Sequence, residues 1–350
     1  MTLKKRILVA PLNWGLGHAT RSIPIINALI DHGFEPVLAS DGGPLALLKK
    51  EFPHLEAIEL PSYHIIYSKK GKFFKWNLLK GSPKIFKAIK AEKKAVKAIV
   101  ETRRIHGIIS DNRMGVRNKN VPSVFITHQL QVLSGSTTWF STTFHKKFMK
   151  HFDECWVPDN HGEPNLSGKL GHPKTYEIPT KYIGPLSRFK KTKTKIKYTV
   201  LVLLSGPEPQ RSMLEKQLLQ EFENCKGNFL FVRGVVEGEQ KKMEKDNMVI
   251  YNFMTSHQLE EALNESELVI SRSGYTTIMD LAKLNKKAFF IPTPGQFEQE
   301  YLAKRLDELG LVPFSNQDDF KIACLNKVQH YKGLSSFENN TDFKELFSLF

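Results

Sequence analysis

The chain is 350 residues long, which favours two domains over a single hydrophobic core. Its hydrophobic fraction of 41% and aromatic fraction of 11% are ordinary for a globular protein, and no apolar run approaches the ~20 residues that span a bilayer. The three cysteines are scattered without metal-ligand spacing, which argues against a disulfide framework and favours a reducing cytoplasm. No small-residue cleavage site follows the basic start, so no signal peptide is predicted.

The first half of the sequence alternates short apolar segments with segments of helical spacing. This alternation predicts a parallel sheet covered by helices on both faces. The predicted strands are 5–12, 34–40, 55–61, 105–112, 121–129, 154–159 and 175–184, with helices ending at Asp31, over 44–51 and through the basic region before 105.

The same pattern restarts after residues 188–197, which hold many cations and few apolar side chains and therefore suit a linker. The sequence predicts an α/β protein of two Rossmann-like domains, 1–187 and 198–335, with a C-terminal helix in 336–350 packing back on the first domain. Ligands in such folds collect at the carboxyl ends of strands, and the expected site is the cleft between the domains. The predicted strands of the second half are 198–206, 227–234, 247–253, 267–274 and 287–294.

The net charge of +15 is concentrated in residues 68–104, which hold thirteen Lys or Arg against two Glu. Bulky apolar side chains stand between these charges. The pattern fits an anionic membrane surface, contacted through 69–104, or another anion, or a solvated helix with one apolar face toward the core. No nucleic-acid motif accompanies the charge, so no nucleic-acid partner is expected. The apolar face of such a helix would contain Ile85, Ala88, Ile89, Val96 and Ile99.

A glycine-containing turn, "NWGLGHATR", follows the first predicted strand. Gly15 and Gly17 let the backbone turn tightly and approach a ligand, and the helix that begins near His18 offers N–H groups to an anion. The helix dipole disfavours an imidazolium, so His18 is predicted to be a neutral ring that accepts a proton, with a helix cap as the alternative. A dinucleotide site is weakly indicated, because Thr20 stands where a third glycine belongs and Asp41 could contact a ribose.

Two further loops follow strands of the second half. "LSGPEPQR" offers Ser205 and Gly206 as hydroxyl and backbone donors, although a plain turn explains this stretch nearly as well. The stretch 267–310 is the most specific, because a strand, the loop "RSGYTT", a helix, "IPTP" and another helix follow in that order. Backbone and polar side-chain groups of residues at its helix starts and first turns can bind phosphate and sugar hydroxyls. These residues are Ser273, Gly274, Thr276, Thr277, Asp280, Gln296, Gln299 and Glu300.

On these loops the chain resembles GT-B glycosyltransferases of family 28, the group that includes the peptidoglycan N-acetylglucosaminyltransferase. The resemblance is strongest over 271–310, good over 13–28 and positional elsewhere. It implies a GT-B fold and a nucleotide-sugar donor bound by the second domain, with no resident cofactor. Metal independence is also expected, because the sequence has no D-x-D motif. Asp280 stands where the family usually has Glu, and Glu300 where it often has a second glutamine, which leaves the donor sugar open.

The resemblance also implies roles for individual residues. His18 corresponds to the family histidine and is the expected catalytic base, while Arg188 and helix N-termini would meet the leaving diphosphate. Asp111, Arg113 and His128 end predicted strands and are expected either to contact the acceptor or to serve structural roles. The implied donor-binding residues are Gly15, Gly17, Arg188, Ser205, Gly206, Phe253, Arg272, Ser273, Gly274, Thr276, Thr277, Asp280, Gln296, Gln299 and Glu300.

The sequence therefore predicts a transferase that moves a hexose or N-acetylhexosamine from a nucleotide sugar, UDP by resemblance, to an acceptor hydroxyl. The expected acceptor is lipid-linked or a polysaccharide, and the expected place is the cytoplasm, peripheral to the inner membrane face. A UDP-sugar hydrolase of the pseudaminic acid pathway type is the main competing interpretation, because its G-x-G-H-x-x-R loop matches "GLGHATR". In that enzyme His18 would activate water. The sequence also leaves open a sugar-nucleotide 2-epimerase and a nucleotide-binding protein without activity.

Overall fold

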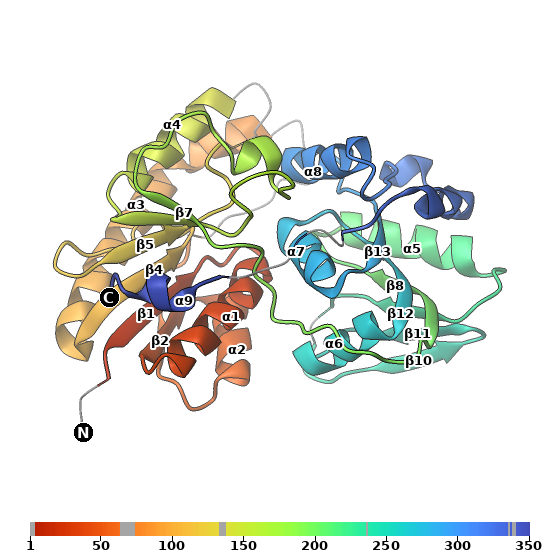
Figure 1. The fold of residues 1–350 in the computed structure, drawn as a ribbon, viewed down its shortest axis with the longest axis horizontal. Coiled ribbons are helices and arrows are strands. Elements are labelled where there is room, and N and C mark those ends of the chain that lie inside the picture. Colours follow the sequence, from red (N-terminus) through yellow and green to blue (C-terminus); the bar gives the residue numbers. More distant parts are fainter. Residues whose placement is uncertain (1–3, 64–73, 133–137, 236, 335–336, 338–340) are drawn as a thin grey trace. The chain divides into compact units, whose positions relative to one another are not determined.

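The computed structural model describes residues 4–63, 74–132, 138–235, 237–334, 337 and 341–350. They form two compact units, each with one sheet (Figure 1). The described residues up to Arg188, together with 341–350, form unit 1, and the described residues between Phe189 and Phe337 form unit 2. The α/β class with two largely parallel sheets, predicted from the alternation of segments, is confirmed.

Unit 1 has a seven-stranded sheet in the order β3-β2-β1-β4-β5-β6-β7, and all of its strand pairs are parallel. The first strand of the chain lies inside this sheet and contains the apolar run Ile7–Ala10, every residue of which is buried because both faces of the sheet are covered. The strands are β1 (Arg6–Pro11), β2 (Glu35–Ser40), β3 (Ala57–Glu59), β4 (Ile105–Asp111), β5 (Ser123–Ile126), β6 (Glu154–Val157) and β7 (Thr180–Tyr182).

Helices cover both faces of this sheet, with α1 and α2 on one face and α3 and α4 on the other (Figure 1). The apolar side of α3, which includes Val96 and Ile99, packs against Leu8, Val37 and Ile108 of the sheet. The expected apolar face of this helix is confirmed at Ala88, Ile89, Val96 and Ile99, whereas the side chain of Ile85 lies outside the described residues. The helices of this unit are α1 (Gly17–Asp31), α2 (Gly42–Glu51), α3 (Phe74–Arg103), α4 (Thr138–Met149) and α9 (Phe343–Phe347).

The short helix α9 belongs to unit 1 although it follows unit 2 in the sequence. The ring of Phe347 lies 5.7 Å from that of Phe34 and 6.2 Å from the indole of the buried Trp156. Phe350 lies against Gly107, where a Cβ atom would come within 2.2 Å of its ring. The last residues of the chain therefore complete the core of the first unit.

Unit 2 has a six-stranded sheet in the order β10-β11-β9-β8-β12-β13, parallel except for the pair β10–β11. Apolar residues of α5 and of the 3-10 helix η5 form the core on one face, and α6 and α7 lie on the other (Figure 1). The elements are β8 (Tyr198–Leu203), α5 (Gln210–Phe222), β9 (Phe229–Val232), β10 (Lys242–Lys245), β11 (Met248–Tyr251), α6 (Ser256–Asn264), β12 (Ser266–Ser271), α7 (Tyr275–Leu284), β13 (Lys287–Phe290), α8 (Phe297–Glu308), η4 (Gln317–Asp319) and η5 (Ile322–His330).

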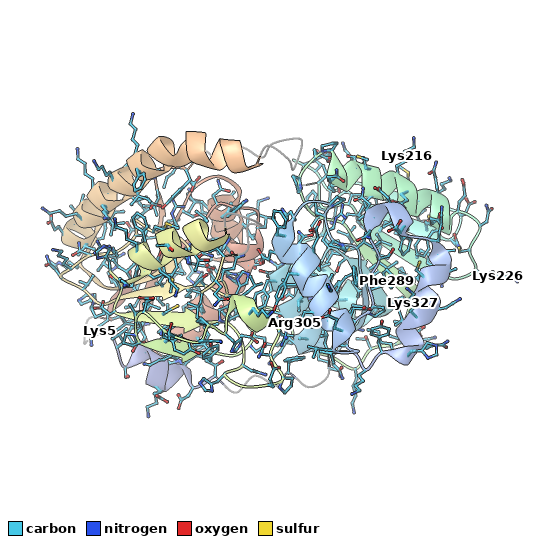
Figure 2. The ribbon with its side chains drawn as sticks, turned by 90° about the horizontal axis from the view of Figure 1, so that it is seen from above. Lys5, Lys216, Lys226, Phe289, Arg305 and Lys327 are labelled. Atoms are coloured by element: carbon cyan, nitrogen blue, oxygen red, sulfur yellow. The ribbon has the colours of Figure 1, made fainter. Side chains whose placement is uncertain are left out.

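The exposed strand β10 and the helices η5 and α4 are absent from the sequence prediction. Strand β10 reads KMEK and is exposed along its length, so it has no buried alternation. Both η5 and α4 were also missed, and no residue of η5 is fully buried. The sequence prediction relied on the contrast between buried apolar and exposed charged side chains. Figure 2 shows this contrast in unit 2, where Phe289 lies inside and Lys216 and Lys226 project outward.

Candidate active site

The predicted loops lie at the two places where the strand order reverses. In unit 1 the chain proceeds from β1 toward β3 on one side and from β4 toward β7 on the other, and in unit 2 the corresponding neighbours are β8 and β12. Ligands of open α/β sheets bind outside the carboxyl ends of such neighbouring strands. The loops after β1, β4, β8 and β12 are therefore the candidate site in each unit.

In unit 1, His18 in the first turn of α1 lies beside Asp111 at the end of β4. The Nδ1 atom of His18 is 2.9 Å from Oδ1 of Asp111, and the side chains are 12% and 2% exposed. The amide of Leu12 donates to the carbonyl of Asp111 at 2.9 Å, which ties the start of the β1–α1 loop to β4. The parallel pairing of β1 and β4 thus brings together two residues that are far apart in the sequence.

A buried guanidinium joins these two residues to His128. Arg21, on the next turn of α1, donates from Nε to Asp111 Oδ2 at 2.6 Å, and a second nitrogen bonds Oδ1 of the same carboxylate. Its third nitrogen lies 3.2 Å from Nδ1 of His128, which follows β5. An arginine only donates, so His128 accepts at Nδ1 and carries its proton at Nε2. Arg21 thus lies among the side chains that support His18 and is itself buried.

Burial and charge set the protonation states here. Burial lowers the pKa of His18, assisted by Arg21 and opposed by Asp111. Burial alone would raise the pKa of Asp111, but the Arg21 guanidinium and His18 outweigh it and hold that pKa well below its ordinary value. The carboxylate is therefore ionised and the imidazole neutral at pH 7.

A neutral histidine held by an ionised carboxylate can act as a general base. When Nδ1–H of His18 donates to Asp111, the lone pair of Nε2 is left to accept a proton. Nδ1 also lies 2.7 Å from a nitrogen of Arg21, which favours the opposite tautomer. The negative charge on Asp111 favours the tautomer of His18 with its proton on Nδ1. It stabilises both that proton and the imidazolium that forms after proton transfer.

Arg113 and Asp41 lie apart from this dyad, in a second buried group. The Nε atom of Arg113 donates to Glu92 of α3 at 2.7 Å, and another nitrogen donates to Asp41 Oδ1 at 2.6 Å. The other oxygen of Asp41 accepts from the side-chain amide of Asn13 at 2.8 Å. The weakly indicated dinucleotide site loses its support, since both oxygens of Asp41 are engaged inside the unit. Contact of Arg113 with an acceptor stays a prediction, and the hydrogen bonds favour its structural alternative.

In unit 2 the β8 and β12 loops approach each other and the end of β13. Ser205 and Gly206 are exposed, and Gly206 has a φ of +104°, which favours glycine. A Cβ atom on Gly206 would lie 3.5 Å from the hydroxyl of Thr293, in contact distance. The buried hydroxyls of Ser271 and Thr293 have no hydrogen-bond partner among the described residues. The sequence analysis missed these two hydroxyls, because serine and threonine at strand ends carry no distinctive pattern.

Arg272 organises this region from the inside. Its guanidinium is buried and donates to the carbonyls of Gln210, Ile291 and Pro292 and to the side chain of Gln317. Burial without a carboxylate partner lowers the pKa of Arg272 to about 10. Direct contact of Arg272 with a nucleotide stays a prediction, and its observed partners hold the loops in place.

The starts of α7 and α8 are joined by side chains. Ser273 donates from its hydroxyl to the carbonyl of Gln299 at 2.7 Å, and the side-chain oxygen of Gln299 accepts from the amide of Thr293 at 2.9 Å. Its side-chain NH₂ group remains to donate. Glu300 accepts from the amide of Gly295 at 2.8 Å. These contacts orient the Gln299 side chain so that its NH₂ group points away from the amide of Thr293.

The remaining predicted residues occupy the same loops or their neighbours. Gly274 is the N-cap residue of α7 and has no side chain to cover the helix start, where Thr276 and Thr277 follow. Asp280 lies in the second turn of α7, and Gln296 is the N-cap residue of α8. Phe253 follows β11 and Arg188 ends unit 1, both partly buried. Gly15 and Gly17 lie in the β1–α1 loop and at the start of α1.

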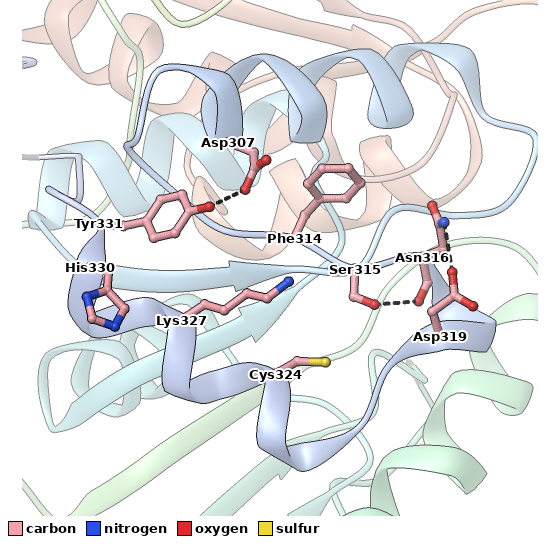
Figure 3. Close-up of a pocket in the computed structure, with 9 residues that line it drawn as sticks. All are labelled: Asp307, Phe314, Ser315, Asn316, Asp319, Cys324, Lys327, His330 and Tyr331. Carbon is pink, nitrogen blue, oxygen red and sulfur yellow. Dashed lines mark hydrogen bonds between the residues drawn. The ribbon is translucent and has the colours of Figure 1, made fainter.

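A hollow of about 540 Å³ lies elsewhere in unit 2 (Figure 3). Two of its carboxylates are already engaged, Asp307 by the hydroxyl of Tyr331 at 2.5 Å and Asp319 by Asn316 at 3.0 Å. It is open to solvent, and none of the predicted site residues lines it. The strand-end loops therefore remain the candidate site. The hollow is lined by Asp307, Phe314, Ser315, Asn316, Asp319, Cys324, Lys327, His330 and Tyr331.

Two further searches concern the described residues alone. They contain no group of three or more His, Cys, Asp or Glu side chains placed to hold a metal ion. Across the same part of the chain, no helix combines the length and apolar character needed to cross a membrane.

Comparison with known proteins bears on this fold and these loops. Residues 201–331 match the glycosyltransferase family 28 C-terminal domain. The UDP-N-acetylglucosamine–N-acetylmuramyl-(pentapeptide) pyrophosphoryl-undecaprenol N-acetylglucosamine transferase of Haemophilus ducreyi is 26% identical over 208 residues, 57% of this chain and 55% of that relative. The chain thus spans about half the length of this curated relative.

Two other matches extend over most of the chain. An uncharacterized glycosyltransferase of Methanopyrus kandleri is 22% identical over 325 residues, 85% of this chain and 86% of the relative. The solved structure of the glycotransferase of kitacinnamycin superposes with a TM-score of 0.64 at 14% identity, covering 96% of this chain and 92% of its own.

These findings place the protein among the GT-B folds, with two parallel-sheet α/β units. More narrowly, it is similar to glycosyltransferase family 28, and residues 201–331 of unit 2 match the C-terminal domain of that family. The resemblance inferred from the sequence motifs is confirmed at this level.

Proposed function

We propose that the protein is a glycosyltransferase that moves a hexose or N-acetylhexosamine from a nucleotide sugar to an acceptor hydroxyl, with inversion and without a metal ion. The observation that carries this proposal is the buried His18–Asp111 pair at the carboxyl ends of β1 and β4. The match of unit 2 to the family 28 C-terminal domain supports the same function. UDP as the nucleotide and a lipid-linked acceptor rest on the similarity to the Haemophilus ducreyi transferase, which is named for both; a polysaccharide acceptor is the other choice.

His18 has the chemistry that the acceptor hydroxyl requires. Its Nε2 would accept the hydroxyl proton as the oxygen attacks the anomeric carbon of the donor sugar. The resulting imidazolium is stabilised by Asp111, whose carboxylate is held ionised by Arg21. General-base catalysis of this kind contributes roughly 10²–10⁴-fold to a rate. His128 carries its proton at Nε2, and we propose that it donates a hydrogen bond to an oxygen of the acceptor substrate.

Unit 2 has the groups that a nucleoside diphosphate requires. The start of α7 at Gly274 directs backbone N–H groups and the positive end of the helix dipole at an anion. We assign the diphosphate to this helix start and the loop with Ser205 and Gly206, and the ribose to Asp280. The donor sugar would meet the NH₂ group of Gln299 and the carboxylate of Glu300. Leaving-group charge is then met by helix and loop donors, assisted by Arg188.

The basic helix α3 supports peripheral binding to an anionic membrane. Lys87, Lys90, Lys94 and Lys97 are exposed and recur at three- and four-residue spacing, so they form one stripe opposite the buried face. The residues before 74 in the basic segment lie outside the described residues. Each such cation adds about 1 kcal/mol of attraction to an anionic surface. We propose that this stripe holds the protein at the inner membrane face, near a lipid-linked acceptor.

The test is a nucleotide-release assay with purified protein and a panel of nucleotide sugars, with and without membrane lipid extract. We expect UDP release that requires the extract and is lost in His18→Ala, while UDP binding, measured by calorimetry, is retained. Lys226→Ala is the control and should keep its activity, because this exposed side chain projects outward between α5 and β9 (Figure 2). Release of free sugar without an acceptor would favour a hydrolase instead. Absence of release from every donor would contradict the proposal.

A further inference from the structure

Arg113 lies completely inside unit 1, at the turn that follows β4. Its side chain is 0% exposed, and its donors go to Glu92 at 2.7 Å, Asp41 at 2.6 Å and the carbonyl of Pro61 at 2.7 Å. A charge at this depth persists only when it is paired and hydrogen-bonded. The guanidinium thus bonds groups inside unit 1, and it links α3 to the ends of β2 and β4.

Asp41 extends this link to the loop that carries His18. It is the N-cap residue of α2 and is 3% exposed. One of its oxygens accepts from Arg113, and the other accepts from the side-chain amide of Asn13 at 2.8 Å. A Cβ atom on Gly42 would come 2.6 Å from that same amide nitrogen, so the start of α2 lies directly against Asn13.

The β1–α1 loop needs such an anchor because much of it is exposed. Trp14 and Leu16 are 43% and 40% exposed, and Gly15 between them has a φ of +74°. One end of the loop is held by the Asn13–Asp41 contact and the other by the His18–Asp111 contact. A side chain that is misplaced by about 1 Å can lose 10²-fold in rate, so the fixed end matters for His18.

We propose that Arg113 and Asp41 are positioning residues, which act through Asn13 to hold the β1–α1 loop and thereby set the place of His18. This inference rests on the proposed function. It assigns Arg113 a role different from acceptor contact.

An exchange of side chains tests the contact without removing the buried arginine. Asn13→Asp places two carboxylates side by side, and Asp41→Asn weakens the bond to Arg113. The double variant Asn13→Asp/Asp41→Asn restores one carboxylate beside one amide, with a neutral acceptor left for Arg113. Asn118→Asp is the matched control, because Asn118 accepts from the amide of Asn120 in another loop of the same unit.

The readouts are kcat and the donor KM for nucleotide release, together with thermal unfolding. We expect Asn13→Asp to lower kcat by about 30-fold, with the donor KM changed by less than about twofold, because a misplaced base slows the chemical step. The kcat of the double variant should recover to within about fivefold of the wild-type value, and the kcat of Asn118→Asp should equal the wild-type value. A double variant no faster than Asn13→Asp would overturn the proposal, as would an Asn13→Asp protein that melts earlier yet keeps kcat within twofold.

Hydrogen exchange separates this inference from the proposed function. Amides of residues 12–18 should exchange about fivefold faster in Asn13→Asp than in the wild type and return toward it in the double variant. If no donor is turned over but the exchange follows this order, the proposed function fails while the anchor stands. Unchanged exchange in Asn13→Asp would overturn the anchor whatever the activity.

Discussion

The loops after β4 in unit 1 and after β12 in unit 2 have corresponding topological positions but hold their buried arginines with different partners. In unit 1 the loops are held by buried ion pairs, with Arg21 on Asp111 and Arg113 on Asp41. In unit 2 the buried cation of the β12 loop, Arg272, bonds carbonyl and amide oxygens, although Arg211 beside the β8 loop is ion-paired with Glu208 and Glu215. The buried arginines near β4 are therefore neutralised by carboxylates, whereas the buried arginine after β12 is held by neutral oxygens.

The largest expected effect concerns the charge behind His18. Asp111→Asn keeps the shape of the side chain but offers an amide to Nδ1, so His18 holds its proton at Nε2 and cannot act as a base. We expect kcat for nucleotide release to fall about 10³-fold, with UDP affinity unchanged within about twofold. Calorimetric titration with UDP checks the second part. A loss of less than tenfold in kcat would show that unit 1 does not work as a fixed base.

The second prediction concerns the interior of unit 2. Arg272→Ala leaves the carbonyls of Ile291 and Pro292 and the side chain of Gln317 without their donor, so the free energy of unfolding should fall by about 3 kcal/mol. Urea denaturation measures this change. Arg103→Ala is the control, since that exposed side chain pairs with Glu56 at the surface, and its loss should cost less than about 1 kcal/mol. Equal losses in the two variants would contradict the structural role of Arg272.

The third prediction uses a buried histidine of α4 in unit 1. Burial, with a smaller contribution from His128, lowers the pKa of His145 to about 4, and its Nδ1 has no hydrogen-bond partner among the described residues. The unfolded chain therefore binds a proton below pH 6.5 that the folded chain refuses until about pH 4, so stability falls as the pH is lowered through this window. At pH 5 the loss is about 2 kcal/mol relative to pH 7.5.

His145→Phe removes that titration beside the ring of Phe125. Urea denaturation from pH 7.5 to 5 should give a shallower decline in the variant than in the wild type. Parallel curves would show that His145 is protonated in the folded protein.

The smallest expected effect compares two buried hydroxyls of unit 2. Ser273 donates to the carbonyl of Gln299, whereas Thr293 has no partner for its hydroxyl among the described residues. Ser273→Ala should cost about 1 kcal/mol of unfolding free energy, and Thr293→Val should cost nothing or stabilise slightly. If the affinity for UDP falls only in Thr293→Val, the Thr293 hydroxyl contacts the nucleotide. The reverse order of stabilities would contradict the hydrogen bonding described.

Local sequence patterns were enough to predict the parallel sheets and the loops at the reversal of strand order, because strands with apolar runs and glycine-containing turns are encoded locally. They were not enough for the partners of those loops. His18 and Asp111 are 93 residues apart, and their contact follows from the register of β1 with β4. Likewise, a lone Asp41 at a strand end resembles a ribose ligand until Arg113 and Asn13 take its two oxygens.

The placement of α9 in unit 1 has a consequence for synthesis on the ribosome. Phe347 and Phe350 cover Trp156 and Gly107, yet the whole of unit 2 is translated between residue 188 and these side chains. At about 5–20 residues per second, the nascent unit 1 waits for this stretch with an aromatic part of its core uncovered. The described residues of unit 2 all lie between 189 and 337, so they can fold together as they emerge. A nascent chain stalled before residue 341 would therefore expose Trp156, and chaperones that recognise aromatic surface should engage the first-made half of this protein for longest.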